Sequence, residues 1–198
     1  MMWTARIALL STGFLTLGGW FDTVLRKRKK RTLLLLLPVL LGLSAVPTLE
    51  TPSVRLCFAP CAFFLCTAIL CPTDQPFSAL ITALLGGFLG WKLIDTFPLF
   101  SEPGLFVALP TLMLGALYCR DANAKALAIA AAPFVMLFFQ MIGDYTLFQS
   151  AVLELGNADA LTAQTVGSGL LLAGGCAWER LRSIRIRKCA STLPIRKM

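Results

Sequence analysis

A block of six consecutive basic residues between two long apolar runs constrains this chain more than any other feature. The block comprises Arg26, Lys27, Arg28, Lys29, Lys30 and Arg31. Because such a cluster does not enter hydrocarbon, it stays on the cytoplasmic side of a membrane during insertion. The apolar runs on either side therefore predict helices that cross the bilayer, with the N-terminus of the first one outside.

The composition agrees with this prediction. Hydrophobic residues make up 57% of the 198 residues and charged residues only 14%, whereas soluble domains carry about 25% charged residues. The net charge is +8, but 13 of the 18 Lys and Arg lie either in the basic block or between residues 180 and 197. Both places flank apolar segments, and no nucleic-acid-binding module accompanies the charge. The basic excess therefore predicts contact with anionic lipid headgroups at the cytoplasmic face and no nucleic-acid partner.

The apolar runs predict an all-α fold, a polytopic bundle of about seven transmembrane helices within residues 1–178 and no soluble domain. The expected spans are residues 3–24, 32–49, 56–71, 77–97, 104–119, 126–149 and 161–178, followed by a basic cytoplasmic tail at 179–198. The third and fifth spans are short for a full crossing. Alternation of sides places fifteen Lys and Arg at the cytoplasmic face and only Arg55 in the outer loops, which is the bias that membrane insertion demands.

Catalytic and metal-binding patterns are absent from the sequence. It has no histidine, the commonest catalytic base and metal ligand. Four of the seven cysteines lie in the run 56–71, but their spacing does not match a zinc motif. Cys57 and Cys71 would lie about 21 Å apart along a helix. The cysteines therefore predict small apolar fillers, and we expect no enzyme activity, no metal and no cofactor.

Small residues recur at close spacing in two of the expected spans. Gly86, Gly87 and Gly90 lie in the fourth span, and Gly167 and Gly174 lie in the seventh. Small residues about four apart let helix backbones approach closely in membranes. These glycines therefore predict helix-packing positions, and no strand precedes them to suggest a dinucleotide-binding loop.

Polar residues inside the expected spans form the candidate site. Counting 1.5 Å per residue along the spans places five positions, Lys92, Asp144, Gln140, Arg6 and Gln164, at similar depth in the outer half of the bilayer, and Asp95 lies three residues from Lys92 on the same helix face. The candidate cluster comprises Asp144, Gln140, Lys92, Asp95 and Arg6, with Gln164 at matching depth. Because charges in hydrocarbon cost about 2.5–3.5 kcal/mol each, they tend to face the bundle interior or a cavity.

Two interpretations of the candidate cluster follow. It is either an outward-facing vestibule for an ion or polar solute, or a set of structural ion pairs and side chains that reach the interface. Gln140 and Asp144 share a helix face, which we expect to turn inward. Lys92 or Arg6 would then approach Asp144.

Several short motifs resemble a known family. They are the turn Arg120-Asp121, the pair Gly143-Asp144, the segment Thr165-Val166-Gly167-Ser168, and Lys92-Leu93-Ile94-Asp95 followed by Pro98. Together these resemble the YphA-type membrane proteins of spore-forming Gram-positive bacteria, over roughly residues 92–175. The resemblance implies a small multi-pass protein of the bacterial plasma membrane and carries no assigned activity, cofactor or substrate.

The packing signals favour a structural or accessory component of the plasma membrane over the alternative, a small carrier or channel that uses the polar cluster. The expected partners are anionic lipid headgroups and either a second copy of the chain or another membrane protein. The N-terminus is expected outside and the C-terminus in the cytoplasm.

Overall fold

The computed structural model describes residues 3–22, 27–46, 48–51, 54–97, 103–148 and 152–191. Within these ranges the chain forms seven α-helices and three short strands. In order they are α1 (Trp3–Leu17), α2 (Lys27–Leu43), β1 (Leu49–Glu50), β2 (Val54–Leu56), α3 (Phe58–Leu70), α4 (Pro76–Thr96), α5 (Pro103–Tyr118), α6 (Ala122–Phe148), β3 (Leu153–Leu155) and α7 (Ala158–Ser191).

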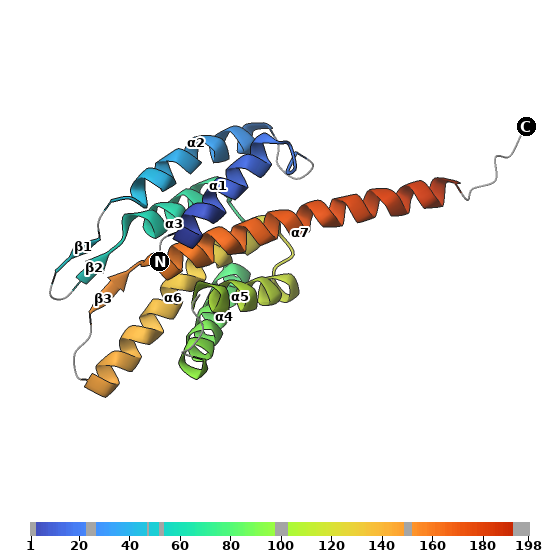
Figure 1. Ribbon diagram of the computed structural model, residues 1–198. Coiled ribbons are helices and arrows are strands. Elements are labelled where there is room, and N and C mark those ends of the chain that lie inside the picture. The colour runs from blue at the N-terminus through green and yellow to red at the C-terminus, as the bar shows by residue number, and fades with distance from the viewer. Residues whose placement is uncertain are drawn as a thin grey trace, which may run out of the picture.

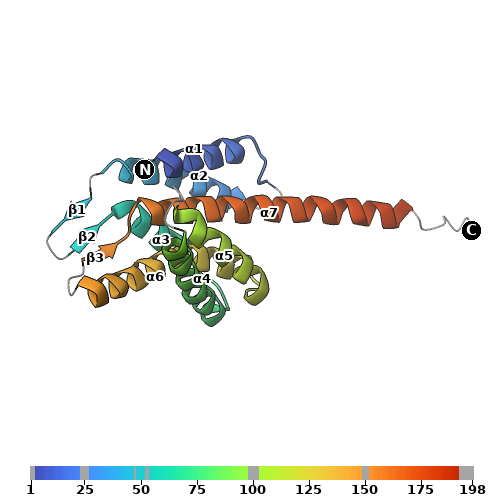
Figure 2. The same ribbon diagram turned by 60° about the horizontal axis from the view of Figure 1, so that its bottom comes forward.

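Helix α7 is the element around which the others pack. It contacts α1, α3, α5 and α6, and in both ribbon views it runs between the α1–α2 pair and the group formed by α4, α5 and α6 (Figures 1 and 2). Helix α4 packs against α5 and α6 on the far side of that group. The C-terminal part of α7 continues well past the other helices (Figure 1).

Three of the seven helices are long and apolar enough to cross a membrane, namely α4, α6 and α7. The apolar parts of α1, α3 and α5 are shorter, at residues 5–17, 58–70 and 104–118, and a crossing needs about 17–25 residues. The apolar runs predicted about seven helices of membrane length, and the structure shows three among the described residues. Hydropathy continues through residues that end a helix, so it overestimates helix length.

Helix α1 illustrates how a backbone signal overrides hydropathy. The apolar run was expected to continue to residue 24, but the helix ends at Leu17. Gly19 follows with a φ of 76°, the left-handed conformation that commonly ends helices at glycine. The amide of Gly18 donates to the Phe14 carbonyl and that of Trp20 to the Leu15 carbonyl, so the last turn is capped.

The helix boundaries also differ around the two basic segments. Lys27 to Arg31 were expected in a loop, but they form the first turns of α2; Arg26 lies outside the described residues. Helix α7 continues to Ser191, so the expected tail at 179–198 begins as helix. At 1.5 Å per residue this 34-residue helix is about 51 Å long, longer than the hydrocarbon core of about 30 Å.

The predicted helical fold is confirmed, and a small three-stranded sheet is added to it. Strand β2 pairs antiparallel with β1 and parallel with β3. The sheet joins connections that were expected to be loops. The sequence signal for β2 and β3 is the alternation of apolar and charged residues at 54–56 and 153–155, a period of two that favours strands.

The start of α7 follows directly after β3. Gly156 has a φ of 88°, and Asn157 caps α7 through its Oδ1, which accepts a hydrogen bond from the Ala160 amide at 2.8 Å.

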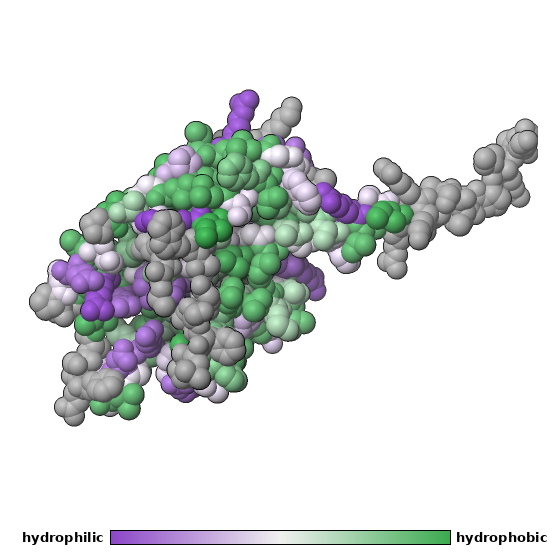
Figure 3. Space-filling view, in the orientation of Figure 1, coloured by the Kyte–Doolittle hydropathy of each residue, from purple (hydrophilic) through white to green (hydrophobic). Residues whose placement is uncertain are grey.

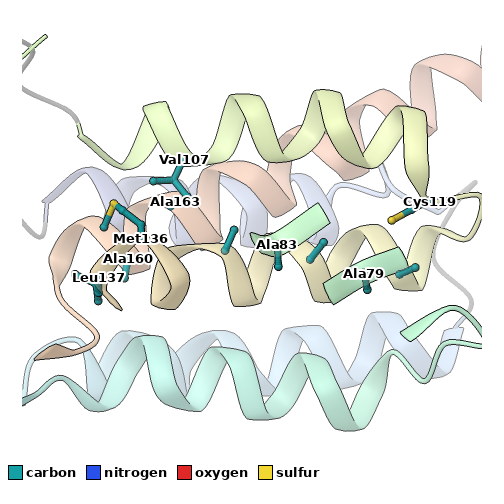
Figure 4. Close-up of a cluster of buried hydrophobic side chains, with 11 residues drawn as sticks. Ala79, Ala83, Val107, Cys119, Met136, Leu137, Ala160 and Ala163 are labelled. Carbon is teal, nitrogen blue, oxygen red and sulfur yellow. The ribbon is translucent and has the colours of Figure 1, made fainter. Parts of the chain in front are cut away.

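The main core lies between α4, α5, α6 and α7 and consists largely of small side chains (Figure 4). Alanines contribute most of it, with Val107, Met136 and Leu137 filling the wider gaps. Small residues let helix backbones approach closely, which increases the van der Waals contact between the helices. Two smaller clusters, one on Leu161 and one on Leu37, pack the α1–α3 side.

The predicted packing glycines divide into two groups. A Cβ atom added to Gly87 would lie 2.6 Å from the Ala132 carbonyl oxygen, and one added to Gly90 would lie 2.7 Å from Val107 Cγ2. Gly86 faces Thr111 and Gly167 faces Ile129 at similarly close range. Gly174 differs, because no atom lies within 4 Å of its added Cβ. The packing prediction is therefore wrong for Gly174, which faces open space on α7.

Candidate functional site

The structure separates the polar residues that the sequence predicted as one cluster. Lys92 and Asp95 lie near the end of α4 and form an ion pair on one helix face, with 3.8 Å between Lys92 Nζ and Asp95 Oδ2. Both side chains are at least half exposed, and Lys92 Nζ also lies 4.2 Å from the centre of the Trp91 ring. This local pair needs no partner from another helix.

Asp144 and Gln140 lie on the exposed C-terminal part of α6. Among the residues that the structure describes, ion pairs join Asp22, Glu50, Glu154 and Asp95 to basic side chains, and none includes Asp144. The predicted approach of Lys92 or Arg6 to Asp144, and the inward turn of this face, are therefore wrong. The last buried side chain described on α6 is Leu137. Beyond it, Phe139 stacks on Trp91 of α4 with 5.8 Å between the ring centres, whereas Gln140 and Asp144 are exposed.

Arg6 has a local role at the other side of the bundle. Its guanidinium donates to the Ser44 carbonyl oxygen at 2.9 Å and to Ser44 Oγ at 3.3 Å. Ser44 is buried and directly follows α2. The last carbonyls of a helix lack partners within it and carry partial negative charge. Arg6 therefore fastens α1 to the C-terminal end of α2.

Gln164 is the one residue of the predicted depth band with a fully buried side chain, at 0% exposure. Its Nε2 donates to the Ala130 carbonyl at 2.9 Å and to the Pro60 carbonyl at 3.2 Å, so it connects α7 to α6 and α3. Its Oε1 is buried without a hydrogen-bond partner among the described residues. The sequence placed Gln164 on the seventh helix beside the candidate cluster but did not show that it, rather than Asp144, lies at the helix interface.

Sequence reasoning missed a groove between α2, α3, α6 and α7. Its volume is about 180 Å³, and apolar side chains form most of its wall. Lys29 lines it, with Cys71 and Thr32 also contributing. The spacing of three to four residues between Lys29, Thr32, Leu36 and Leu40 places them on one face of α2, and this was the available signal.

The groove opens near a cluster of three connections. Lys29 Nζ donates to Asn123 Oδ1 at 3.2 Å, and Asn123 Nδ2 donates to the Pro72 carbonyl at 2.8 Å. The Arg120 amide donates to Gln75 Oε1 at 3.2 Å. These bonds hold the start of α2, the α3–α4 connection and the α5–α6 connection together at one end of the bundle, which we call the basic end.

The opposite end holds the sheet, and we call it the strand end. Arg55 on β2 pairs with Glu154 on β3 at 3.3 Å and lies 4.0 Å from Glu50 on β1. Such exposed pairs contribute little stability, about 0–1 kcal/mol, but they mark which connections share an end of the molecule.

Metal-ligating residues do not gather anywhere in the described part of the chain: no three His, Cys, Asp or Glu side chains lie close enough to hold one ion. The six cysteine side chains that are described are free thiols.

Comparison with known proteins gives no match for this chain: no protein-family model, no curated protein and no solved structure matches it. The geometry above therefore carries the functional argument alone.

Proposed function

We propose that this chain is an integral, multi-pass protein of the bacterial plasma membrane with a structural or accessory role and no catalytic activity. The observation that carries the proposal is that three helices of membrane length, α4, α6 and α7, belong to a bundle whose core consists of small side chains. That is how helices associate in lipid. The YphA-type resemblance noted above is part of the same proposal.

The outer surface supports placement in lipid. Ile69 is 77% exposed, Phe77 80% and Leu117 79%, and these three belong to three different helices. Hydrophobic residues cover much of the visible face of the helices, while hydrophilic residues gather where the strands lie (Figure 3). Soluble monomers rarely expose contiguous apolar patches larger than a few hundred Å².

We further propose that the chain crosses the bilayer about seven times, with the shorter helices shielded by their neighbours. The contacts at the two ends support this proposal. The α3–α4 and α5–α6 connections lie at the basic end, and the α2–α3 and α6–α7 connections lie at the strand end, as alternating crossings require. The basic end would face the cytoplasm with α7's C-terminal part, and the N-terminus would lie outside. A membrane-protein partner or a second copy remains part of the accessory role.

The dispersed polar residues favour the accessory role over a carrier or channel. Lys92 pairs with Asp95, Arg6 bonds Ser44, and Asp144 lies apart on the exposed end of α6. A carrier site near the bilayer midplane normally gathers its polar groups between helices.

Proteoliposomes separate the two roles. Purified protein should leave proton and monovalent-ion fluxes at the level of protein-free liposomes, and Asp144→Asn should behave like the unsubstituted protein. Lys92→Gln should likewise leave the fluxes unchanged, because the Lys92 side chain is also exposed. A flux well above the lipid background that Asp144→Asn abolishes would overturn the accessory role and establish the carrier.

A further inference from the structure

We propose that the groove between α2, α3, α6 and α7 binds one acyl chain of an anionic phospholipid, with the phosphate of its headgroup against Lys29. This inference rests on the proposed membrane location and adds a specific lipid site to it. Three properties of the groove carry the proposal: its lining, its length and the charge at its mouth.

The lining of the groove matches hydrocarbon. Leu36 and Leu40 of α2, Phe63 and Leu70 of α3, and Leu171 and Leu172 of α7 form its wall. Its volume of about 180 Å³ exceeds that of an apolar cavity of about 150 Å³ that stays dry and takes up benzene. Water gains few hydrogen bonds there, so a lipid tail is the occupant that the wall favours.

The length of the groove matches one leaflet of a bilayer. Its lining residues on α2 run from Lys29 to Leu40, eleven residues apart, and therefore extend about 16 Å along the helix axis. Half of a hydrocarbon core of about 30 Å is about 15 Å. An acyl chain that enters beside Lys29 would thus reach the bilayer midplane near Leu40.

The mouth of the groove is positively charged. Helix α2 begins at Lys27 and has no acidic residue in its first turn, so a run of cations meets the positive end of the helix dipole. Asp22 and the segments 27–31, 72–76 and 120–125, which meet at the basic end, together hold seven Lys and Arg against three Asp. A phosphate at this position would reduce the repulsion among these basic side chains and pair with the exposed Lys29 ammonium.

A second groove gives an internal comparison. It lies between α1 and α2, has a volume of about 190 Å³, and is lined by apolar residues, glycine and proline without a charged side chain. Leu10, Phe14 and Leu41 belong to its wall. A phospholipid whose tail binds in this second groove would show no preference between anionic and neutral headgroups. A preference for anionic headgroups therefore distinguishes the first groove from the second.

Native mass spectrometry of the purified full chain tests the proposal with two probes of equal chain length, a phosphatidylglycerol and a phosphatidylcholine. The protein should retain one phosphatidylglycerol about five-fold more tightly than phosphatidylcholine, since a basic residue near an anionic surface contributes about that factor. Lys29→Gln should abolish the preference, whereas Arg31→Gln, an exposed cation of α2 outside the groove lining, should keep it.

A groove-filling variant tests the tail site separately. Leu36→Trp should lower the retention of both lipids by several-fold, and Leu10→Trp in the second groove should not alter the headgroup preference. Equal retention of the two lipids, equal effects of Lys29→Gln and Arg31→Gln, or unchanged retention in Leu36→Trp would each overturn the site. Carbonate extraction of cell membranes separates this failure from that of the proposed function: a chain that stays in the pellet but shows no preference refutes the lipid site alone.

Discussion

A glutamine side chain buried among three helices has to satisfy its amide group where water is excluded. Gln164 does so only in part, because its Nε2 bonds two carbonyls while its Oε1 stays unpaired among the described residues. An unpaired buried polar atom costs about 1–3 kcal/mol, and a hydrogen bond between membrane helices is worth about 0.6 kcal/mol. The side chain therefore stabilises the bundle mainly by filling the space between α3, α6 and α7.

We predict that Gln164→Ala lowers the free energy of unfolding by about 2–3 kcal/mol. Truncating a buried long side chain to alanine costs about 2–5 kcal/mol, and removal of the unpaired Oε1 offsets part of this loss. Gln140→Ala is the matched control, because Gln140 is exposed on α6 and its replacement should change stability by less than about 0.5 kcal/mol. Denaturant titration of the detergent-solubilised variants measures both, and equal effects would contradict the placement of Gln164.

At the scale of elements, contacts of backbone against backbone hold α4 to its neighbours. Gly87 lies against the Ala132 carbonyl and Val135 of α6, and Gly90 lies against Val107 of α5. These positions leave no room for a methyl group unless a helix moves. On α7, by contrast, Gly174 has open space around it, so a side chain there displaces nothing.

Gly87→Ala and Gly174→Ala should therefore change stability in opposite directions. In an unstrained helix, alanine is more stable than glycine by about 0.5–1 kcal/mol, which should raise the stability of Gly174→Ala. For Gly87→Ala, overpacking costs about 1–3 kcal/mol and outweighs that gain, so the midpoint of thermal unfolding in detergent should fall. A rise for both variants would show that α4 and α6 are not in close contact.

The sequence predicted the helical elements well and their ends and faces poorly. Apolar runs located all seven helices, because a chain in lipid satisfies its backbone within helices. The apolar runs overestimated the length of α1, because Gly18 and Gly19 end the helix while the apolar run continues. They also missed the sheet, since pairing of β2 with β3 brings together residues about a hundred positions apart.

The candidate site shows the same limit at the level of side chains. Spacing correctly placed Lys92 and Asp95 on one face of α4, because both residues belong to one helix. Spacing also placed Gln140 and Asp144 together on α6, but the direction of their face depends on where the neighbouring helices end. The groove at Lys29 requires four helices to be in position, so no single segment of sequence shows it.

At the scale of the whole molecule, the two ends of the bundle differ in charge and in structure. The basic end joins three connections through Lys29, Asn123 and Pro72, and the strand end joins two others through Arg55 and Glu154. Moving a run of lysine and arginine across a bilayer is costly, so the basic end should stay in the cytoplasm. The strand end, where Arg55 pairs with Glu154, should be the end that crosses during insertion.

We therefore predict opposite accessibility for cysteines introduced at the two ends. In intact cells, a membrane-impermeant thiol reagent should label Glu154→Cys and leave Lys29→Cys and Arg187→Cys unlabelled, with the unsubstituted chain giving the background from the native thiols. After the membrane is permeabilised, Lys29→Cys should react as well, because Lys29 is exposed in the folded protein. Labelling of Lys29→Cys in intact cells would invert the orientation. Labelling of Arg187→Cys alone would instead mean that the chain crosses an odd number of times between Lys29 and Arg187, so that one of the short helices, α3 or α5, does not span.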